Sequence, residues 1–244
     1  MNEAASALET FYEWVQESRK IVFFGGAGVS TESGIPDFRS KDGLYNQKYA
    51  YPPEMILSHS FFRSNPEEFF RFYRDKILIG GAKPNTTHLA LAKLEKEGRL
   101  LSVVTQNIDG LHQAAGSKRV WELHGSTLRN TCERCGRKWG KDRIESQSGV
   151  PRCECGGIIK PDVVLYEEGL DDAVLRGAIT DLANADMLII GGTSLTVYPA
   201  AGLIDAYTGR RMALINRDAT SGDRKAQLVL HCSLGSVFEY FLKD

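Results

Sequence analysis

The sequence has no long hydrophobic run and no excess of charge of one sign. None of its apolar stretches approaches the ~20 consecutive residues of a membrane-spanning helix, and residues 1–6 lack the basic flank and apolar core of a signal peptide. There are 30 basic and 31 acidic side chains, giving a formal net charge of -1. Nucleic-acid and membrane-surface binders usually carry a marked basic excess. We therefore expect a cytoplasmic protein without nucleic-acid or membrane partners, and the near-neutral charge and short termini lead us to expect a monomer.

Cysteine is scarce, and its number is odd. Four of the five cysteines form two close pairs, Cys132 with Cys135 and Cys153 with Cys155, separated by seventeen residues. This spacing is typical of a four-thiolate zinc site, although the second pair has one intervening residue where two are common. Free thiols or a redox pair are the alternative. Because protein would supply all four ligands, we expect one structural, non-catalytic zinc ion. The isolated Cys232 is expected to be a small buried residue.

Two familiar nucleotide-binding signatures are also missing. Gly26 and Gly28 are followed next by Gly34, so the spacing of the dehydrogenase fingerprint is absent, and no Gly-Lys-Ser/Thr follows. The glycines do follow an apolar run at residues 21–24, which predicts a buried strand entering a tight turn. Without a Cβ, glycine backbone can approach a ligand closely. A simple glycine turn after a core strand is the alternative.

The residues after this turn favour a ligand site. Ser30 or Thr31 could cap a following helix, whose N-terminal N–H groups would favour a pyrophosphate. Residues 36–39 combine a proline, an acid, an aromatic ring and a guanidinium. That combination suits a loop that closes over a bound molecule.

Hydrophobic patterning elsewhere predicts an α/β fold. An amphipathic helix is expected over residues 3–18, and a helical pattern covers residues 88–94. The aromatic-rich segment 40–82 is expected to contain helices and loops. Buried strands are expected at residues 21–24, 100–105, 160–166, 186–194, 212–216 and 228–230, and a short apolar stretch covers residues 120–123. Apolar strands that alternate with helices predict a doubly wound parallel sheet.

Polar residues follow one of the expected strands and the short apolar stretch at residues 120–123. Gln106, Asn107 and Asp109 come directly after the strand at 100–105, where open α/β sheets form their ligand crevice. Capping of the next helix is the alternative for each one. His124 follows another apolar stretch; a lone histidine is more often structural, yet its side chain is well suited to accept a proton near neutral pH.

Taken together, these motifs resemble the sirtuin family of NAD-dependent protein deacylases, in a compact bacterial form. The matching segments occur in the family's order over nearly the whole chain. They are residues 26–30, 34–39 and 105–109, His124 with Gly125, the two cysteine pairs, and residues 192–195.

The resemblance implies a Rossmann-like NAD-binding domain with two smaller modules. The large domain would comprise residues 1–41, 83–128 and 158–244. A helical and loop module would cover residues 42–82, and a zinc-ribbon module residues 129–157. NAD would lie between the large domain and the small modules, and an acetyl-lysine peptide would enter from the other side of the cleft.

The resemblance also implies roles for individual residues. His124 would be the general base, and Asn107 a second catalytic residue. Val164, Tyr166 and Val197 would contact the substrate peptide, which would add as a strand between residues 163–166 and 195–198. The residues implied to bind the cofactor are Ala27, Thr31, Phe38, Arg39, Gln106, Asn107, Ile108, Asp109, His124, Thr193, Ser194, Asn216, Arg217 and Cys232.

The implied reaction joins the acyl oxygen of the lysine to the ribose as nicotinamide leaves. His124 would then activate a ribose hydroxyl, and the products would be free lysine, nicotinamide and O-acyl-ADP-ribose. An NAD-dependent mono-ADP-ribosyltransferase and a non-catalytic nucleotide-sensing module are the alternatives. Product mass separates the first from a deacetylase, and absence of turnover identifies the second.

Three features depart from the family pattern. Gly25 stands where the family usually has threonine, and Glu167 where it usually has glycine. Family members that remove acidic acyl groups carry a tyrosine and an arginine three residues apart, where this chain has Phe70 and Tyr73. We therefore expect a preference for acetyl and other uncharged acyl groups over succinyl.

Overall fold

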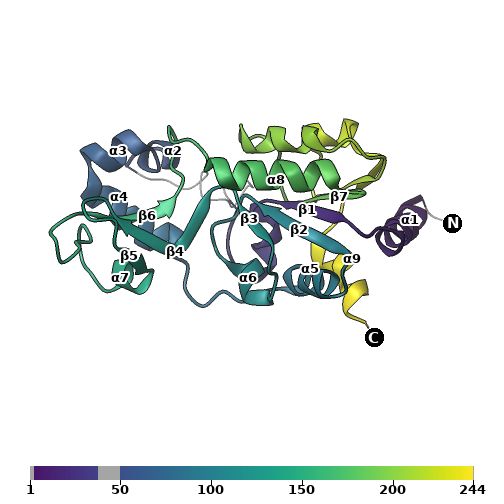
Figure 1. Ribbon diagram of the computed structural model, residues 1–244, viewed down its shortest axis with the longest axis horizontal. Helices are drawn as coiled ribbons and strands as arrows, with labels where there is room; N and C mark the ends of the chain where they lie inside the picture. Colours follow the sequence, from purple (N-terminus) through teal and green to yellow (C-terminus); the bar gives the residue numbers. More distant parts are fainter. Residues whose placement is uncertain (1–2, 38–49, 244) are drawn as a thin grey trace.

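The computed structural model describes residues 3–37 and 50–243, and Figure 1 shows an elongated molecule with a large and a small part. The large part is built on a parallel sheet with the strand order β3-β2-β1-β7-β8-β9. Its strands are β1 (Ile21–Gly25), β2 (Leu100–Thr105), β3 (Val120–Glu122), β7 (Met187–Gly191), β8 (Met212–Ile215) and β9 (Leu228–Leu230). The predicted parallel sheet is therefore confirmed.

Helices cover both faces of this sheet (Figure 1). Alternate residues of β1 pack into separate cores, with Phe23 on one face and Phe24 on the other. One face carries α1 (Glu3–Glu17), α5 (Thr86–Lys96) and α9 (Leu234–Phe238), and the other α8 (Asp172–Asn184) and η5 (Ala200–Ala206). The central strands are apolar on both sides because both faces are covered. In the described part of the chain, no helix is both long and apolar enough to cross a membrane.

The small part contains a second sheet, with the antiparallel order β5-β4-β6. Its strands are β4 (Gly125–Cys132), β5 (Lys138–Gly140) and β6 (Ile159–Val163), and α7 (Asp142–Glu145) follows β5. The prediction that residues 160–166 return to the parallel sheet is wrong. The alternation of apolar residues correctly predicts a strand here. This strand, β6, pairs with β4 of the cysteine-bearing part and not with a strand of the parallel sheet.

The predicted helical segment packs directly on this small sheet. It contains α2 (Pro53–Ile56), α3 (His59–Ser64), α4 (Pro66–Phe72) and a π-helical turn, η4 (Tyr73–Ile77). Phe62 and Phe70 from the helices share one buried cluster with Cys132, Cys153 and Ile159 from the cysteine-bearing part. The helical segment and the cysteine-bearing part are therefore stabilised by a common core. The small sheet also extends beyond residues 129–157, because β4 begins before residue 129 and β6 lies after residue 157.

The helix predicted after the glycine turn is not formed. Two short 3-10 turns, η1 (Ala27–Val29) and η2 (Thr31–Ser33), follow β1, and the side chain of Ser30 makes no capping hydrogen bond. The chain leaves the second turn through Gly34, whose φ is 82°. The expected helix N-terminus for a pyrophosphate is therefore absent at this position, and the Ser30 hydroxyl is used elsewhere.

Candidate active site

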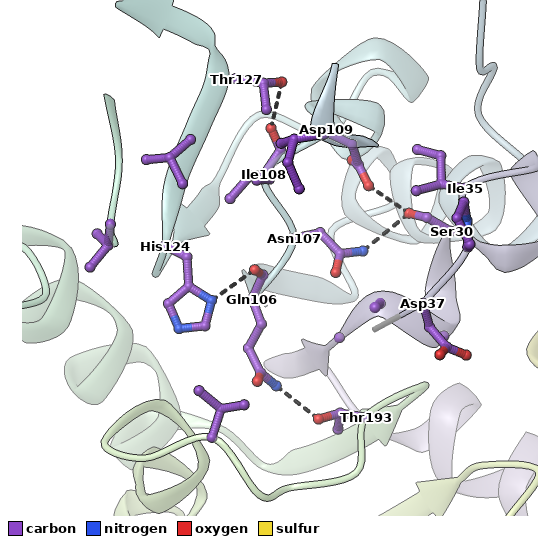
Figure 2. A pocket seen from close by; sticks show the side chains of 18 of the residues that line it. Ser30, Ile35, Asp37, Gln106, Asn107, Ile108, Asp109, His124, Thr127 and Thr193 are labelled. Carbon is purple, nitrogen blue, oxygen red and sulfur yellow. Dashed lines mark hydrogen bonds between the residues drawn. The ribbon is translucent and has the colours of Figure 1, made fainter. Parts of the chain in front are cut away.

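A cavity of about 670 Å³ lies at the carboxyl ends of β1, β2 and β7, between the large and small parts. Its wall includes residues 106–109 after β2, His124 before β4, and residues 192–194 after β7. Figure 2 shows these side chains converging on one space. Parallel strands bring their carboxyl ends to one edge of a sheet, so segments far apart in sequence meet here.

Ser30 joins the two polar residues that follow β2. Its Oγ donates to Asp109 Oδ2 at 2.7 Å and accepts from Asn107 Nδ2 at 3.1 Å (Figure 2). Asp109 Oδ1 also accepts the Leu111 N–H at 2.9 Å, so both carboxylate oxygens are engaged. Ser30 is 1% exposed, so these bonds form in a buried setting. The arrangement fixes Asn107 and Asp109 before any ligand arrives.

His124 presents a defined tautomer to the cavity. Its Nδ1 lies 2.9 Å from the carbonyl oxygen of Gln106 (Figure 2). A carbonyl oxygen only accepts, so Nδ1 carries the hydrogen and Nε2 keeps its lone pair. Burial lowers the pKa of His124, against the opposing effect of the Gln106 hydrogen bond. A neutral imidazole with a free Nε2 lone pair is suited to act as a general base.

The glycine turn after β1 is packed against the glycine turn after β7. The Gly28 N–H donates to the Gly192 carbonyl at 2.8 Å, and a Cβ on Gly28 would lie 2.7 Å from Gly192 Cα. A Cβ on Gly25 would lie 2.7 Å from the Phe23 ring, which belongs to the core. Gly28 is thus required for close contact between the two turns, and Gly25 for packing beside the core. Gln106 Nε2 donates to Thr193 Oγ1 at 2.9 Å and ties the β2 and β7 loops together.

Most of the residues expected from the sequence line the cavity, and a few do not. Thr31 is not among the lining residues, and its hydroxyl donates to the Gly28 carbonyl at 3.0 Å. Arg217 is exposed, and the partly buried Cys232 packs against a hydrophobic core of the large part. The predictions for Phe38 and Arg39 lie outside the described residues. Those that line the cavity are Ala27, Gln106, Asn107, Ile108, Asp109, His124, Val164, Tyr166, Thr193, Ser194, Val197 and Asn216.

The segment after β6 forms another edge of the cavity. The Val164 N–H donates to the His124 carbonyl at 2.9 Å, which connects this edge to the histidine. Tyr166 uses both of its backbone polar groups, donating to Leu57 and accepting from His59 at 3.0 Å each. An added peptide strand therefore cannot pair through the main chain of Tyr166. The segment between α2 and α3 occupies this side of Tyr166, and the pairing of a peptide strand with residues 163–166 stays a prediction.

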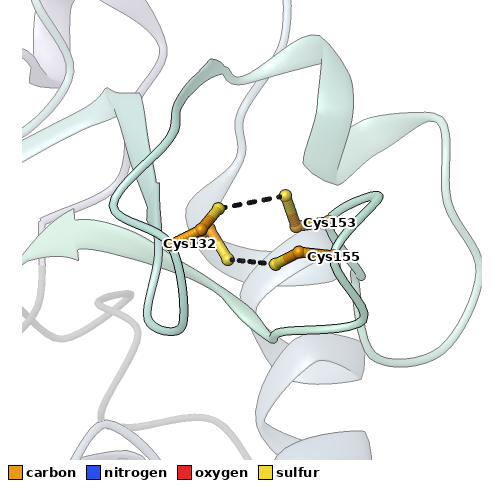
Figure 3. Close-up of side chains that lie close together, drawn as sticks. Cys132, Cys153 and Cys155 are labelled. Carbon is orange, nitrogen blue, oxygen red and sulfur yellow. Dashed lines mark hydrogen bonds between the residues drawn. The ribbon is translucent and has the colours of Figure 1, made fainter.

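The four clustered cysteines are arranged for a metal ion. Their Sγ atoms all lie within 4.8 Å of one another, and none is in a disulfide. The pairs Cys132–Cys155 and Cys135–Cys153 are 3.5 and 3.7 Å apart, and Figure 3 shows the sulfurs facing a common centre. Tetrahedral Zn–S bonds of ~2.3 Å place sulfurs about 3.8 Å apart, so the donor set fits zinc. The one-residue spacer between Cys153 and Cys155 does not prevent this geometry.

The sequence predicts Ser30 as a possible helix cap and does not predict that it connects Asn107 and Asp109. Its sequence neighbours give no sign of partners 77 and 79 positions away. One signal could have identified this role. Ser30 lies in the turn after β1, and the polar residues 106–109 follow β2, the strand next to β1 in the sheet.

Comparison with known proteins is consistent with this geometry. The sequence model described as "Sir2 family" matches residues 26–199. The NAD-dependent protein deacetylases of Clostridium acetobutylicum and Clostridium perfringens are 57% and 59% identical to this chain over 229 residues. Each alignment covers 92% of this chain and 94% of the relative.

Solved structures extend the comparison to three dimensions. A structure of Sir2 with a deacetylated p53 peptide and 3'-O-acetyl ADP-ribose has a TM-score of 0.88 at 40% identity, covering 96% of both chains. A complex of Sir2 with a p53 peptide and NAD+ has a TM-score of 0.85 at 40% identity, covering 96% of this chain and 97% of that one. On these matches in sequence and structure, the chain belongs to the Sir2, or sirtuin, family.

Proposed function

We propose that this protein is an NAD-dependent protein-lysine deacetylase. It would transfer the acetyl group from lysine to ADP-ribose and release nicotinamide. The observation that carries the proposal is the meeting of His124 with the Ser30, Asn107 and Asp109 group in one cavity. Relatives at 57% and 59% identity are NAD-dependent protein deacetylases, which supports the same activity here.

NAD fits the donor set of this cavity. When bound, NAD supplies the ribose carbon from which nicotinamide departs and the hydroxyl that accepts the acetyl group. Asp109 and Ile108 would receive the nicotinamide amide, while Gln106 and Asn107 would contact the adjoining ribose. The phosphates and the adenosine would be held by the other proposed cofactor residues, which are Ala27, Thr31, Arg39, Thr193, Ser194, Asn216, Arg217 and Cys232. Phe38 would shield the space left by nicotinamide.

His124 would act as the general base on a ribose hydroxyl. The Gln106 carbonyl holds Nδ1–H, so Nε2 is the atom that would take the proton. Asn107 would assist by orienting the sugar, because Ser30 fixes its amide. General base catalysis contributes typically ~10²–10⁴-fold to a rate.

The acetyl-lysine peptide would bind along the edge formed by residues 163–166 and 195–198. Val164, Tyr166 and Val197 line the cavity there and would contact the lysine side chain. A Sir2 structure with an acetylated peptide has a TM-score of 0.85 and 38% identity to this chain, which supports a peptide substrate.

We further propose the remaining features of the protein. The four cysteines would hold one structural zinc ion. The division into residues 1–41, 83–128 and 158–244, with modules at 42–82 and 129–157, remains our proposal for the domains. A cytoplasmic monomer without nucleic-acid or membrane partners accords with the near-neutral charge.

The test is nicotinamide release from NAD with an acetyl-lysine peptide, in the wild type and in His124→Ala. We expect peptide-dependent release with a matching loss of acetyl mass, and a fall in turnover of ~10²–10⁴-fold in the variant. A gain of ADP-ribose mass on the peptide would instead indicate a mono-ADP-ribosyltransferase. NAD binding without turnover on acyl-lysine peptides would indicate a nucleotide-sensing module.

A further inference from the structure

Backbone strain is found at two edges of the cavity. Glu167 has a φ of 75° and Leu195 a φ of 53°, and among the described residues these are the non-glycine residues with positive φ. Glu167 lines the cavity, and Leu195 lies between the lining residues Ser194 and Val197. Such backbone strain persists only where surrounding contacts hold it.

The side chain of Glu167 supplies such contacts. Its Oε2 accepts the Ser60 N–H and its Oε1 accepts the Ser60 hydroxyl, each at 2.9 Å. Ser60 lies in the first turn of α3, where N–H groups have no partner within the helix. Ser58 caps the same turn by accepting the Phe61 N–H at 3.2 Å. Two side chains thus satisfy two first-turn donors, and one of them comes from the cavity edge.

This tie lies in a segment that is also held at its other end. Val164 is bonded to the His124 carbonyl, and Tyr166 forms a parallel bridge with Ser58. Glu168 closes the turn, because its Oε2 accepts the Leu165 N–H at 2.9 Å and its Oε1 lies 2.8 Å from His59 Nδ1. The edge from residue 164 to 168 therefore connects His124 to α3.

We propose that the Glu167 carboxylate is a positioning group for the substrate peptide. By bonding Ser60, it holds the edge at residues 164–168 in its strained conformation before the peptide arrives. This inference rests on the proposed deacetylase function. The edge is then already ordered when the peptide binds. Binding therefore does not lose the conformational entropy of ordering it, and the peptide binds more tightly.

Two variants separate this role from a role in stability. Glu167→Gly removes the carboxylate and tolerates positive φ, whereas Glu167→Ala removes the carboxylate and keeps the strain. Loss of the carboxylate should raise the KM for an acetyl-lysine peptide about three- to ten-fold in both, the effect of losing hydrogen bonds of ordinary strength. The kcat and the KM for NAD should stay within about two-fold, because the His124 contact to Gln106 is retained. The Tm should fall in the alanine variant and change little in the glycine variant.

Further variants test whether the hydrogen bonds between Glu167 and Ser60 are responsible for the effect. Glu167→Gln keeps one acceptor oxygen and should restore part of the peptide affinity. Ser60→Ala should raise the KM less than Glu167→Gly does, since the backbone donor remains, and should add nothing to it in the double variant. Glu54→Ala removes an exposed acid on α2 and serves as the charge control, with unchanged KM expected.

Peptide binding is measured by fluorescence anisotropy alongside turnover. If both Glu167 variants bind and turn over the peptide as the wild type does, the inference is overturned. It is also overturned if KM rises only in the variant that loses stability. If the wild type neither binds nor deacetylates the peptide, the proposed function fails and this inference fails with it.

Discussion

The Nδ1 atom of His124 lies 2.9 Å from the carbonyl oxygen of Gln106, and this contact determines which ring nitrogen faces the chemistry. Gln106 is the first residue after β2, and its side chain also reaches Thr193 on the β7 loop. One residue therefore sets the tautomer of His124 and links the loops that follow β2 and β7. The protonation state of His124 follows from the same environment.

We expect activity to persist below the usual titration range of histidine. Burial lowers the pKa of His124, so the imidazole stays neutral at pH values where an exposed histidine is protonated. A plot of kcat/KM for the acetyl peptide against pH should fall on its acid side at a pH below about 6.5. An acid limb centred above pH 7 would contradict a depressed pKa for the base.

Ser30→Ala should lower kcat/KM for NAD, although the change removes only one hydroxyl group. The change removes the donor to Asp109 and the acceptor for Asn107 in a buried site, and hydrogen bonds to charged groups are worth about 1.5–3 kcal/mol. We expect a fall in kcat/KM for NAD of roughly ten-fold or more, measured by nicotinamide release. Ser33→Ala is the control, because its hydroxyl contacts Asn85 instead. Equal activity of the two variants would contradict the role of Ser30.

Removal of zinc should unfold the small part and abolish activity. Cys132 and Cys153 belong to the same buried cluster as Phe62 and Phe70, so loss of the metal also loosens the helical segment. We expect one zinc ion per chain by elemental analysis, lost in Cys153→Ser together with deacetylation. Cys232→Ser should retain the metal. Full zinc content in Cys153→Ser would contradict the four-cysteine site.

Succinyl-lysine peptides should be poor substrates. Phe70 and Tyr73 are both 0% exposed and carry no cation. The two arginines beside them are engaged elsewhere: Arg71 pairs with Glu68 at 2.5 Å, and Arg74 donates to the carbonyls of Ile144 and Gly149. We expect kcat/KM for desuccinylation to be at least ~10²-fold below deacetylation, because a buried carboxylate without a partner is costly. Comparable rates on matched peptides would show that another cation reaches the acyl chain.

Acidification should destabilise the fold before the carboxylates titrate. Burial lowers the pKa of His88 to about 4, against the opposing effect of Asp109, and burial with the neighbouring His88 lowers the pKa of His112 to about 3. Both ring nitrogens of His112 are buried without a hydrogen-bond partner among the described residues. The unfolded chain takes up protons near pH 6.5, so stability is complete above that pH and falls as the pH drops toward the folded values.

Each such histidine contributes a slope of up to about 1.4 kcal/mol per pH unit. Urea unfolding at several pH values between 6.5 and 5 measures this slope, and His112→Leu should reduce it. An unfolding free energy that is constant over this range would contradict the prediction.

Local sequence determined the elements and the type of chemistry. Alternation and apolar runs in β1, β2, β7 and β8 require burial on both faces, so the parallel sheet follows from the pattern. Polar residues that directly follow β2 lie at the edge of the sheet where the parallel strands end. Two closely spaced cysteine pairs are typical of a shared zinc ion. These features depend on neighbours in the chain, which is why the sequence is sufficient to predict them.

Only the tertiary structure decided which distant residues meet. The pairing of β6 with β4, the Ser30 contacts to Asn107 and Asp109, and the Glu167 contacts to Ser60 each join segments far apart in sequence. Hydrogen-bond partners of this kind depend on packing of the whole chain, and local propensity carries no information about them. The sequence thus determined which groups are present at the site, and the fold decided their tautomer, orientation and partners.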